Sequence, residues 1–284
     1  MIFKYVLTFV GLLFISSLLI YLRRIASHLH SVPECRHTDL KRTSDIQRHA
    51  NAFVISECNS ARYNFSIHNL ERGFPNFFTF ICHRYPFLND SRIHTSGAMV
   101  DKKISSNLIA FIDVWTYKIP ETSTFDNEWS FVFEDDVNIV EPSRWILQNR
   151  SLSLPNYTEI LSELMHDSEV RNAHGFFYMG ICGPQYKTTK RPIETFHNMI
   201  HHYRGHGMCA HAIAITKSRA RTFWPTLSSF RPNGDYPMDV FINAVSVRSG
   251  MDFYTLGANI EMPPRTGHFG IVYQDRKTFK TTVW

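Results

Sequence analysis

Three consecutive carboxylates, Glu134, Asp135 and Asp136, directly follow an apolar run at residues 129–133. A buried strand cannot hold three adjacent charges without partners, so we expect them where the strand leaves its sheet. Neighbouring side chains alternate in direction, so two of the three can converge on one point. Carboxylate oxygens suit Mg²⁺ or Mn²⁺, and such a cation would neutralise a nucleotide diphosphate as it leaves. The alternative is a solvated acidic turn that caps a helix near Pro142.

A second group of candidate ligands is the cluster of His201, His202, His206, Cys209 and His211, which lies within eleven residues. A zinc site is conceivable here, but the spacing matches neither the H-E-x-x-H motif nor a zinc finger. Ordinary loop histidines and side chains that contact a substrate are the other two interpretations.

Strand and helix patterns alternate along the body of the chain. The predicted strands are residues 52–56, 76–82, 129–133, 176–179, 212–216, 253–256 and 271–273. The predicted helices are residues 61–70 with a cap at Asn59-Ser60, a segment capped at Ser105-Ser106 and ending at 115, and residues 157–166, 217–224 and 238–247. This alternation predicts an α/β fold with a mainly parallel sheet and helices on both faces. Such sheets bind ligands at the carboxyl ends of their strands.

The N-terminal segment at residues 5–22 contains 18 residues without a charge, which is close to the minimum for crossing a bilayer. Lys4 precedes this segment and Arg23 follows it. We predict an uncleaved signal anchor with a luminal body, and a signal peptide cleaved near Ala26-Ser27 is the alternative. The flanking charges do not fix the orientation, because the basic residues on the C-terminal side oppose the positive-inside rule.

Four Asn-x-Ser/Thr sequons, at Asn64, Asn89, Asn149 and Asn156, weakly favour a luminal location. Chance alone would give about two or three such sequons, so the excess is small. The predicted parts of the chain are a cytoplasmic tail (1–4), the anchor (5–22), a basic stalk (23–48) and a globular domain (49–284).

The composition is that of a globular protein, since 44% of the residues are hydrophobic and 14% are aromatic, which excludes intrinsic disorder. The 30 basic and 25 acidic residues give a net charge of +5 that is spread along the chain. This charge suits a small anionic ligand and does not indicate a nucleic-acid partner. Five cysteines without a C-x-x-C pair allow one or two disulfides and leave at least one thiol over.

Residues 131–137, Phe-Val-Phe-Glu-Asp-Asp-Val, resemble the hydrophobic-Glu-Asp-Asp-Val core of glycosyltransferase family 25, which includes procollagen galactosyltransferases and bacterial lipopolysaccharide glycosyltransferases. Further segments resemble this family in the same order; they are the strand at 52–56, the helix with Arg62, the helix at 105–115, Tyr178-Met179-Gly180, the block at 207–220, the segment at 238–241 and the closing stretch at 270–278 with Gln274. The chain departs from the family at two places: Ile112 and Asp113 stand near its Ser-His position, and His211 stands where a tyrosine is usual.

The resemblance implies a Rossmann-like GT-A fold that takes a UDP-sugar, carrying galactose or glucose, together with Mn²⁺ or Mg²⁺. It implies that Asp136, with Asp135 or Glu134, holds the cation against the donor diphosphate. His268 is a further candidate metal ligand. Arg62 would lie near the nucleotide at a helix start, where a guanidinium and backbone N–H groups favour anions; an exposed helix arginine is the alternative.

The resemblance also places Ile55, at the end of the first strand, and His211 beside the donor. Asp239 opens a helix after the turn that contains Asp235. A transfer with inversion, which the resemblance alone implies, needs a carboxylate that takes the proton of the acceptor hydroxyl. Asp239 is the candidate for this base and Asp235 is the second choice. The alternative is that Asp239 only interacts with the helix dipole.

Two classes of function remain open at this point. The first is a hexosyltransferase of the Golgi or endoplasmic reticulum membrane, single-pass type II, that acts on a hydroxyl of a glycan or glycoprotein acceptor. The second is a catalytically silent domain of the same fold that binds a glycan or a protein. Metal-dependent hydrolysis of a phosphoester is a weaker third interpretation, because the sequence shows no second cluster of ligands.

Overall fold

The computed structural model of the chain describes residues 49–93, 102–140, 156–168, 170, 175–182, 191–193, 200–204, 208–228, 236–249, 252–256 and 268–279. The predicted tail, anchor and stalk lie outside this part of the chain, and so does Asp235. None of the helices that it contains combines the length and the apolar character that a membrane span requires.

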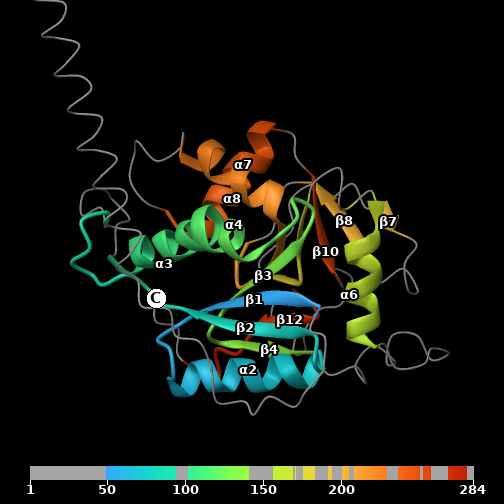
Figure 1. Cartoon of the computed structure of the whole chain (residues 1–284), viewed down its shortest axis with the longest axis horizontal. Helices are drawn as coiled ribbons and strands as arrows, with labels where there is room; N and C mark the ends of the chain where they lie inside the picture. The colour runs from blue at the N-terminus through green and yellow to red at the C-terminus, as the bar shows by residue number, and fades with distance from the viewer. Residues whose placement is uncertain are drawn as a thin grey trace, which may run out of the picture. The chain divides into compact units, whose positions relative to one another are not determined.

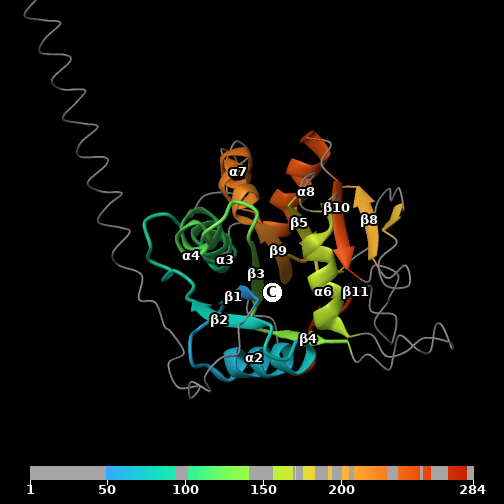
Figure 2. The same ribbon diagram turned by 45° about the vertical axis from the view of Figure 1, so that its right-hand side comes forward.

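The main sheet of the described residues has its strands in the order β2-β1-β3-β9-β5-β10-β8-β7 (Figure 1 and Figure 2). These strands are β1 (Ala50–Ile55), β2 (Phe78–His83), β3 (Trp129–Glu134), β5 (Phe176–Tyr178), β7 (Arg191–Ile193), β8 (Ile200–Arg204), β9 (Ala212–Thr216) and β10 (Asp252–Leu256). β1, β3 and β9 lie among other strands and are almost entirely buried, which explains why their sequences are continuous apolar runs.

The sheet is mixed, which corrects the prediction of a mainly parallel one. β2, β1 and β3 are parallel to one another, and β10 is parallel to β5. β9 is antiparallel to both of its neighbours, β3 and β5, and β8 and β7 add antiparallel pairs at one edge. The sequence could not predict this, because an apolar run identifies a buried strand without giving its direction.

Helices cover both faces of the sheet, as predicted (Figure 2). One face packs against α3 (Lys102–Asp113), the π-helix η1 (Val114–Lys118), α4 (Ile119–Thr122), α7 (Lys217–Ser228) and α8 (Met238–Ser249). The other face packs against α2 (Ala61–Gly73) and α6 (Tyr157–His166). The alternation of a strand produces this division: Ala52 and Val54 of β1 belong to the core under α2, and Phe53 and Ile55 belong to the core under α3.

Two small antiparallel sheets extend the carboxyl edge of the main sheet. One pairs β4 (Val137–Ile139) with β12 (Val272–Gln274), and the other pairs β6 (Gly180–Cys182) with β11 (His268–Gly270). Gly180 and Gly270 are opposite each other, and a Cβ at Gly180 would overlap the carbonyl oxygen of Val272. The two glycines therefore let the small sheets approach each other at backbone distance.

The helix starts show one confirmed and one wrong prediction. α2 begins after Ser60, whose side chain accepts a hydrogen bond from Tyr63 N, so the predicted cap is confirmed. The predicted cap at Ser105-Ser106 is wrong, because α3 is already helical at Lys102 and both serines are buried inside it. Ser106 instead donates from its hydroxyl to a backbone carbonyl, which satisfies the buried group without a cap.

Four of the five cysteines form two disulfides, Cys58–Cys82 and Cys182–Cys209. This agrees with the expectation of one or two disulfides, and the remaining Cys35 lies outside the described residues. The first disulfide joins the segment after β1 to β2, and the second joins β6 to the segment before β9. Both therefore brace the carboxyl edge of the main sheet.

Candidate functional site: a carboxylate cluster at the sheet edge

The carboxyl ends of β1, β2 and β3 lie side by side, because Ile55 is opposite both His83 and Glu134 in the parallel pairs. β9 runs in the opposite direction, so its start reaches the same edge, and Glu134 N donates to the carbonyl of His211 at 2.9 Å. β3 ends at Glu134, and the next two residues form the turn to β4. The three carboxylates thus leave the strand at this edge, as the sequence predicted.

Asp135 is enclosed by the end of β1 and the first turn of α2. Its Oδ2 accepts a hydrogen bond from Ser56 Oγ at 2.8 Å. Its Oδ1 accepts from Arg62 Nε at 2.9 Å and lies 2.8 Å from Arg62 Nη2. The Arg62 guanidinium also lies over the ring of Phe279, 5.4 Å from its centroid. Both oxygens of Asp135 are therefore in use within the protein, and Arg62 is an ion-paired, mostly buried residue instead of an exposed helix arginine.

Asp136 lies beside the same guanidinium but keeps one oxygen without a partner. Its Oδ2 is 3.3 Å from Arg62 Nη2. Its Oδ1 is buried and has no hydrogen-bond partner among the described residues. Burial raises the pKa of Asp136; the charges of Arg62 and Arg276 oppose this rise, and the charge of Asp135 adds to it. A buried carboxylate oxygen without a donor is costly unless a cation or a proton joins it.

Glu134 is held by two side-chain amides from opposite sides. Asn107 Nδ2, on α3, donates to Oε1 at 3.1 Å. Gln274 Nε2, at the end of β12, donates to Oε2 at 2.5 Å. Burial raises the pKa of Glu134, and the charge of Asp136 adds to this rise. Glu134 therefore links α3, β3 and β12, and both of its oxygens already accept a hydrogen bond.

The cluster carries more negative than positive charge. Asp135 and Asp136 are only 4% and 3% exposed, so the alternative of a solvated acidic turn is wrong. Arg62 forms the ion pairs that the described residues make with both carboxylates, and Arg276 adds a second positive charge that acts on Asp136. A divalent cation fits this arrangement, because it would balance the excess charge and give Asp136 Oδ1 a partner. The described histidine, cysteine and acidic side chains nevertheless form no group of three that could hold a metal.

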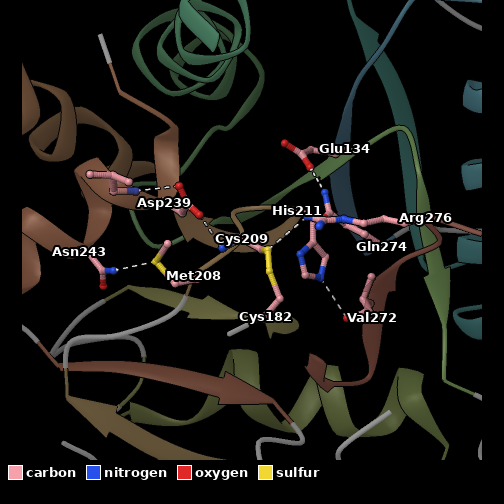
Figure 3. The surroundings of a disulfide bond; sticks show 11 residues. Glu134, Cys182, Met208, Cys209, His211, Asp239, Asn243, Val272, Gln274 and Arg276 are labelled. Carbon is pink, nitrogen blue, oxygen red and sulfur yellow. Dashed lines mark hydrogen bonds between the residues drawn. A yellow bond between two sulfur atoms is a disulfide. The ribbon is translucent and has the colours of Figure 1, made fainter. Parts of the chain in front are cut away.

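Asp239 stands in the first turn of α8 and belongs to the same electrostatic environment. Its Oδ2 accepts from Cys209 N at 2.8 Å and its Oδ1 from Val240 N at 2.9 Å (Figure 3). Burial raises the pKa of Tyr178, the last residue of β5, and the charge of Asp239 adds to this effect. Asp239 also contributes to the raised pKa of Glu134. The predicted base is therefore half-buried, oriented by backbone N–H groups and near the end of β3.

For His211, Ile55 and His268, the structure gives a position in the fold. His211 is fully buried, and its Nε2 lies 3.2 Å from the carbonyl oxygen of Val272. Ile55 is fully buried at the end of β1. His268 belongs to β11 through its backbone, opposite Cys182, and its side chain lies outside the described part of the structure. The contacts of these residues with a donor or a metal stay predictions.

The structure removes Cys209 from the candidate zinc ligands of the histidine and cysteine cluster. Cys209 is bonded to Cys182, so it cannot act as a thiolate ligand. His201 and His202 belong to β8, and their side chains, like the whole of His206, lie outside the described residues.

Sequence reasoning missed several residues of the site. Asn107, Arg276 and Tyr85 all lie near the carboxylates, and the charges of these carboxylates, after burial, raise the pKa of Tyr85. Tyr85 comes two residues after the end of β2, a position at the carboxyl edge that could have indicated it. Asn107 and Arg276 carried no such signal, since the pairing of their segments with β3 is a property of the tertiary structure.

His83, the last residue of β2, is buried, and we predict that its protonation lowers the free energy of unfolding at acid pH. It is 4% exposed, and its Nε2 has no hydrogen-bond partner among the described residues. Burial lowers its pKa to about 4, and Lys118 and Arg92 add to this effect. The unfolded chain takes up a proton below about pH 6.5 and the folded chain only near pH 4, so stability is lost as the pH falls through this window.

A shift of this size is worth about 3 kcal/mol at most. We expect the free energy of unfolding, measured with urea at several pH values, to fall less between pH 7 and pH 4 in His83→Gln than in the wild type. Parallel pH profiles of the two proteins would show that His83 does not carry this effect. The comparison is needed because Glu134 and Asp136, whose pKa values are raised, act in the opposite direction.

The described residues define an α/β fold with a mixed sheet flanked by helices, and the fold carries buried carboxylates at the strand ends. No family model matches the sequence, and a search of curated proteins finds no similar chain. The geometry of the sheet edge is therefore the observation from which a function can be proposed.

Proposed function

We propose that this protein is a metal-dependent glycosyltransferase that moves a hexose from a UDP-sugar to a hydroxyl of a glycan or glycoprotein acceptor. The observation that carries the proposal is the buried Oδ1 of Asp136, which has no hydrogen-bond partner among the described residues and lies in a cluster of acids at the carboxyl edge of the sheet. Open α/β sheets bind nucleotides at this edge. The resemblance of residues 131–137 to glycosyltransferase family 25 supports the same class.

Asp136 is the residue best suited to hold Mn²⁺ or Mg²⁺, because the oxygens of Asp135 and Glu134 already accept hydrogen bonds within the protein. When bound, the cation would stabilise the charge that develops on the leaving diphosphate. Two protein carboxylates or fewer are a usual number for Mg²⁺, whose other positions are taken by water and substrate phosphates. Arg62 keeps Asp135 and Asp136 in place through its ion pairs.

Asp239 is the candidate general base. Its two oxygens accept hydrogen bonds from backbone N–H groups, which fix the carboxylate without a competing cation among the described residues. As the acceptor oxygen forms its bond to the anomeric carbon and the bond to the diphosphate oxygen breaks, the hydroxyl proton would pass to Asp239. Transfer by this route inverts the configuration at the anomeric carbon.

A catalytically silent binding domain is the second candidate function, and one observation favours it. His211, which stands where the related family has a tyrosine, is fully buried against the carbonyl of Val272, so it offers no surface to a sugar. A chain that keeps the fold and loses such a contact could bind a ligand without transferring it.

The two disulfides support a compartment with oxidising conditions, such as the secretory pathway. A membrane-anchored protein of the Golgi or endoplasmic reticulum, with the globular domain in the lumen, agrees with this and rests further on the sequence of residues 5–22.

The proposal is tested by incubating the purified full-length chain with a panel of UDP- and GDP-sugars, with Mn²⁺ or with a chelator, and by measuring the free nucleotide. We expect release from one donor in the presence of Mn²⁺, and a rate at least about 100-fold lower with the chelator. Binding of a UDP-sugar without release, even when glycan acceptors are added, would support the silent domain. Release that the chelator does not change would contradict a metal-dependent transferase.

A further inference from the structure

Arg276 is the last member of a chain of hydrogen bonds that starts at Glu134 (Figure 3). Glu134 Oε2 accepts from Gln274 Nε2, and Gln274 Oε1 accepts from Arg276 Nη2 at 2.9 Å. A guanidinium can only donate, so Gln274 turns its amide oxygen toward Arg276 and its amide nitrogen toward Glu134. Asn107 holds the far side of Glu134. The chain therefore runs from α3 to the end of β12 and fixes the position of Arg276.

The backbone brings Arg276 next to Asp136. β12 pairs with β4 directly after the carboxylate turn, with Gln274 opposite Val137. One residue further on, Asp275 N donates to the carbonyl of Asp136 at 2.7 Å. Arg276 follows immediately, and its charge, like that of Arg62, opposes the rise that burial causes in the pKa of Asp136. The guanidinium thus belongs to the same site as the partnerless Asp136 Oδ1.

Hydrogen bonds fix the turn that carries Arg276, whereas its guanidinium is exposed to solvent. Asp275 Oδ1 accepts from Thr278 N at 3.0 Å, which fixes the turn. Arg276 itself is exposed. Its hydrogen bonds within the described structure come from Nη2 alone, to Gln274 and, at 3.9 Å, to Cys209 Sγ. Nε and Nη1 remain available for an anion.

We infer that Arg276 binds the diphosphate of the donor and that Glu134 and Gln274 position it for this contact, an inference that rests on the proposed function. Arg62 could bind the diphosphate only by breaking its ion pair with Asp135. Arg276, in contrast, donates hydrogen bonds within the described structure from Nη2 alone. A guanidinium with two free N–H groups matches a pair of phosphate oxygens. Glu134 is in this view a positioning residue and not a metal ligand.

The inference is tested by calorimetric titration of the full-length chain with UDP and with GDP, in the presence of Mn²⁺. For the nucleotide that the wild type binds, we expect Arg276→Ala to raise the Kd by about 30-fold, the effect of a lost charge-assisted hydrogen bond. Arg276→Lys keeps the charge and loses the planar fork, so its Kd should rise by about 5-fold. Arg221→Ala removes another exposed arginine, which pairs with Asp126 before the opposite end of β3, and should change nothing.

Gln274→Ala separates positioning from a general effect on the fold. It leaves Arg276 in the chain but removes its anchor, so we expect the Kd for the nucleotide to rise by about 10-fold. The Kd for uridine or guanosine, which have no phosphate, should stay within error of the wild type. A loss of nucleoside affinity of the same size would show a structural role and would contradict the inference.

The outcomes also separate this inference from the proposed function. If the wild type binds a nucleoside diphosphate and Arg276→Ala binds it equally well, the role of Arg276 is wrong and the proposed function stands. If the wild type binds neither UDP nor GDP with Mn²⁺, both are wrong.

Discussion

Replacing Asp136 with asparagine is expected to lower kcat/KM for donor cleavage by about 1,000-fold or more, which corresponds to about 4 kcal/mol of lost transition-state stabilisation. The substitution keeps the size of the side chain and removes the negative charge from a buried carboxylate that has one oxygen without a hydrogen-bond partner among the described residues. The measurement is the rate of nucleotide release at saturating Mn²⁺ with the donor that the wild type uses.

The same substitution should not harm the fold. Burial raises the pKa of Asp136, so the folded state disfavours its charged form, and a neutral side chain of the same shape should be at least as stable at pH 7. The melting temperature of the metal-free variant is therefore expected to equal or exceed that of the wild type. Asp126→Asn is the matched control, because Asp126 is 67% exposed and precedes the opposite end of β3.

Two results would count against this account of Asp136. One is a variant that keeps more than about a tenth of the wild-type rate, since a metal-binding carboxylate contributes far more than that. The other is an equal loss of rate in Asp126→Asn, which would trace the effect to a general change in charge.

Arg62→Leu should give the largest change in stability. The guanidinium is the partner of both Asp135 and Asp136, at 2.8 and 3.3 Å, and its side chain is only 18% exposed. Its removal takes the ion-pair partner from two buried carboxylates, which costs about 3–5 kcal/mol at pH 7. We expect the melting temperature of the metal-free protein to fall by about 10 °C.

The double variant Arg62→Leu/Asp135→Asn identifies the cause. It removes one of the two carboxylates that lose their ion-pair partner, so it should recover at least half of the lost stability if electrostatics explains the loss. Arg221→Leu breaks an exposed pair with Asp126 and should cost less than about 1 kcal/mol. A double variant that is no more stable than Arg62→Leu would mean that the arginine acts through packing, for example against Phe279.

The position of the carboxylates could be predicted from the sequence because the signal is local. An apolar run followed by three acids predicts a strand and its end, and β3 with its turn has that form. The partners of these acids could not be predicted. Arg62 is 73 residues from Asp135, and Gln274 is 140 residues from Glu134. Only the sheet order and the return of β12 to β4 bring these residues together.

The fold shows the same limit. Helices on both faces follow from the alternation of buried positions, as in β1, where Phe53 and Val54 belong to opposite cores. The direction of β9 and the three-residue strands around Gly180 and Gly270 do not, because they depend on backbone pairing between distant segments. β6 carries Cys182 of the second disulfide, and β12, which follows β11, carries Gln274, so these segments that the sequence missed lie beside the site.

The central claim is that the turn after β3 binds a divalent cation together with a nucleoside diphosphate. It is tested most directly by titrating the full-length chain with Mn²⁺ and recording the free ion by electron paramagnetic resonance, with and without UDP. The account predicts one bound Mn²⁺ per chain whose Kd falls at least about 10-fold when UDP is present, and no such site in Asp136→Asn. The account is contradicted if the wild type does not bind Mn²⁺, or if Asp136→Asn binds Mn²⁺ as strongly as the wild type does.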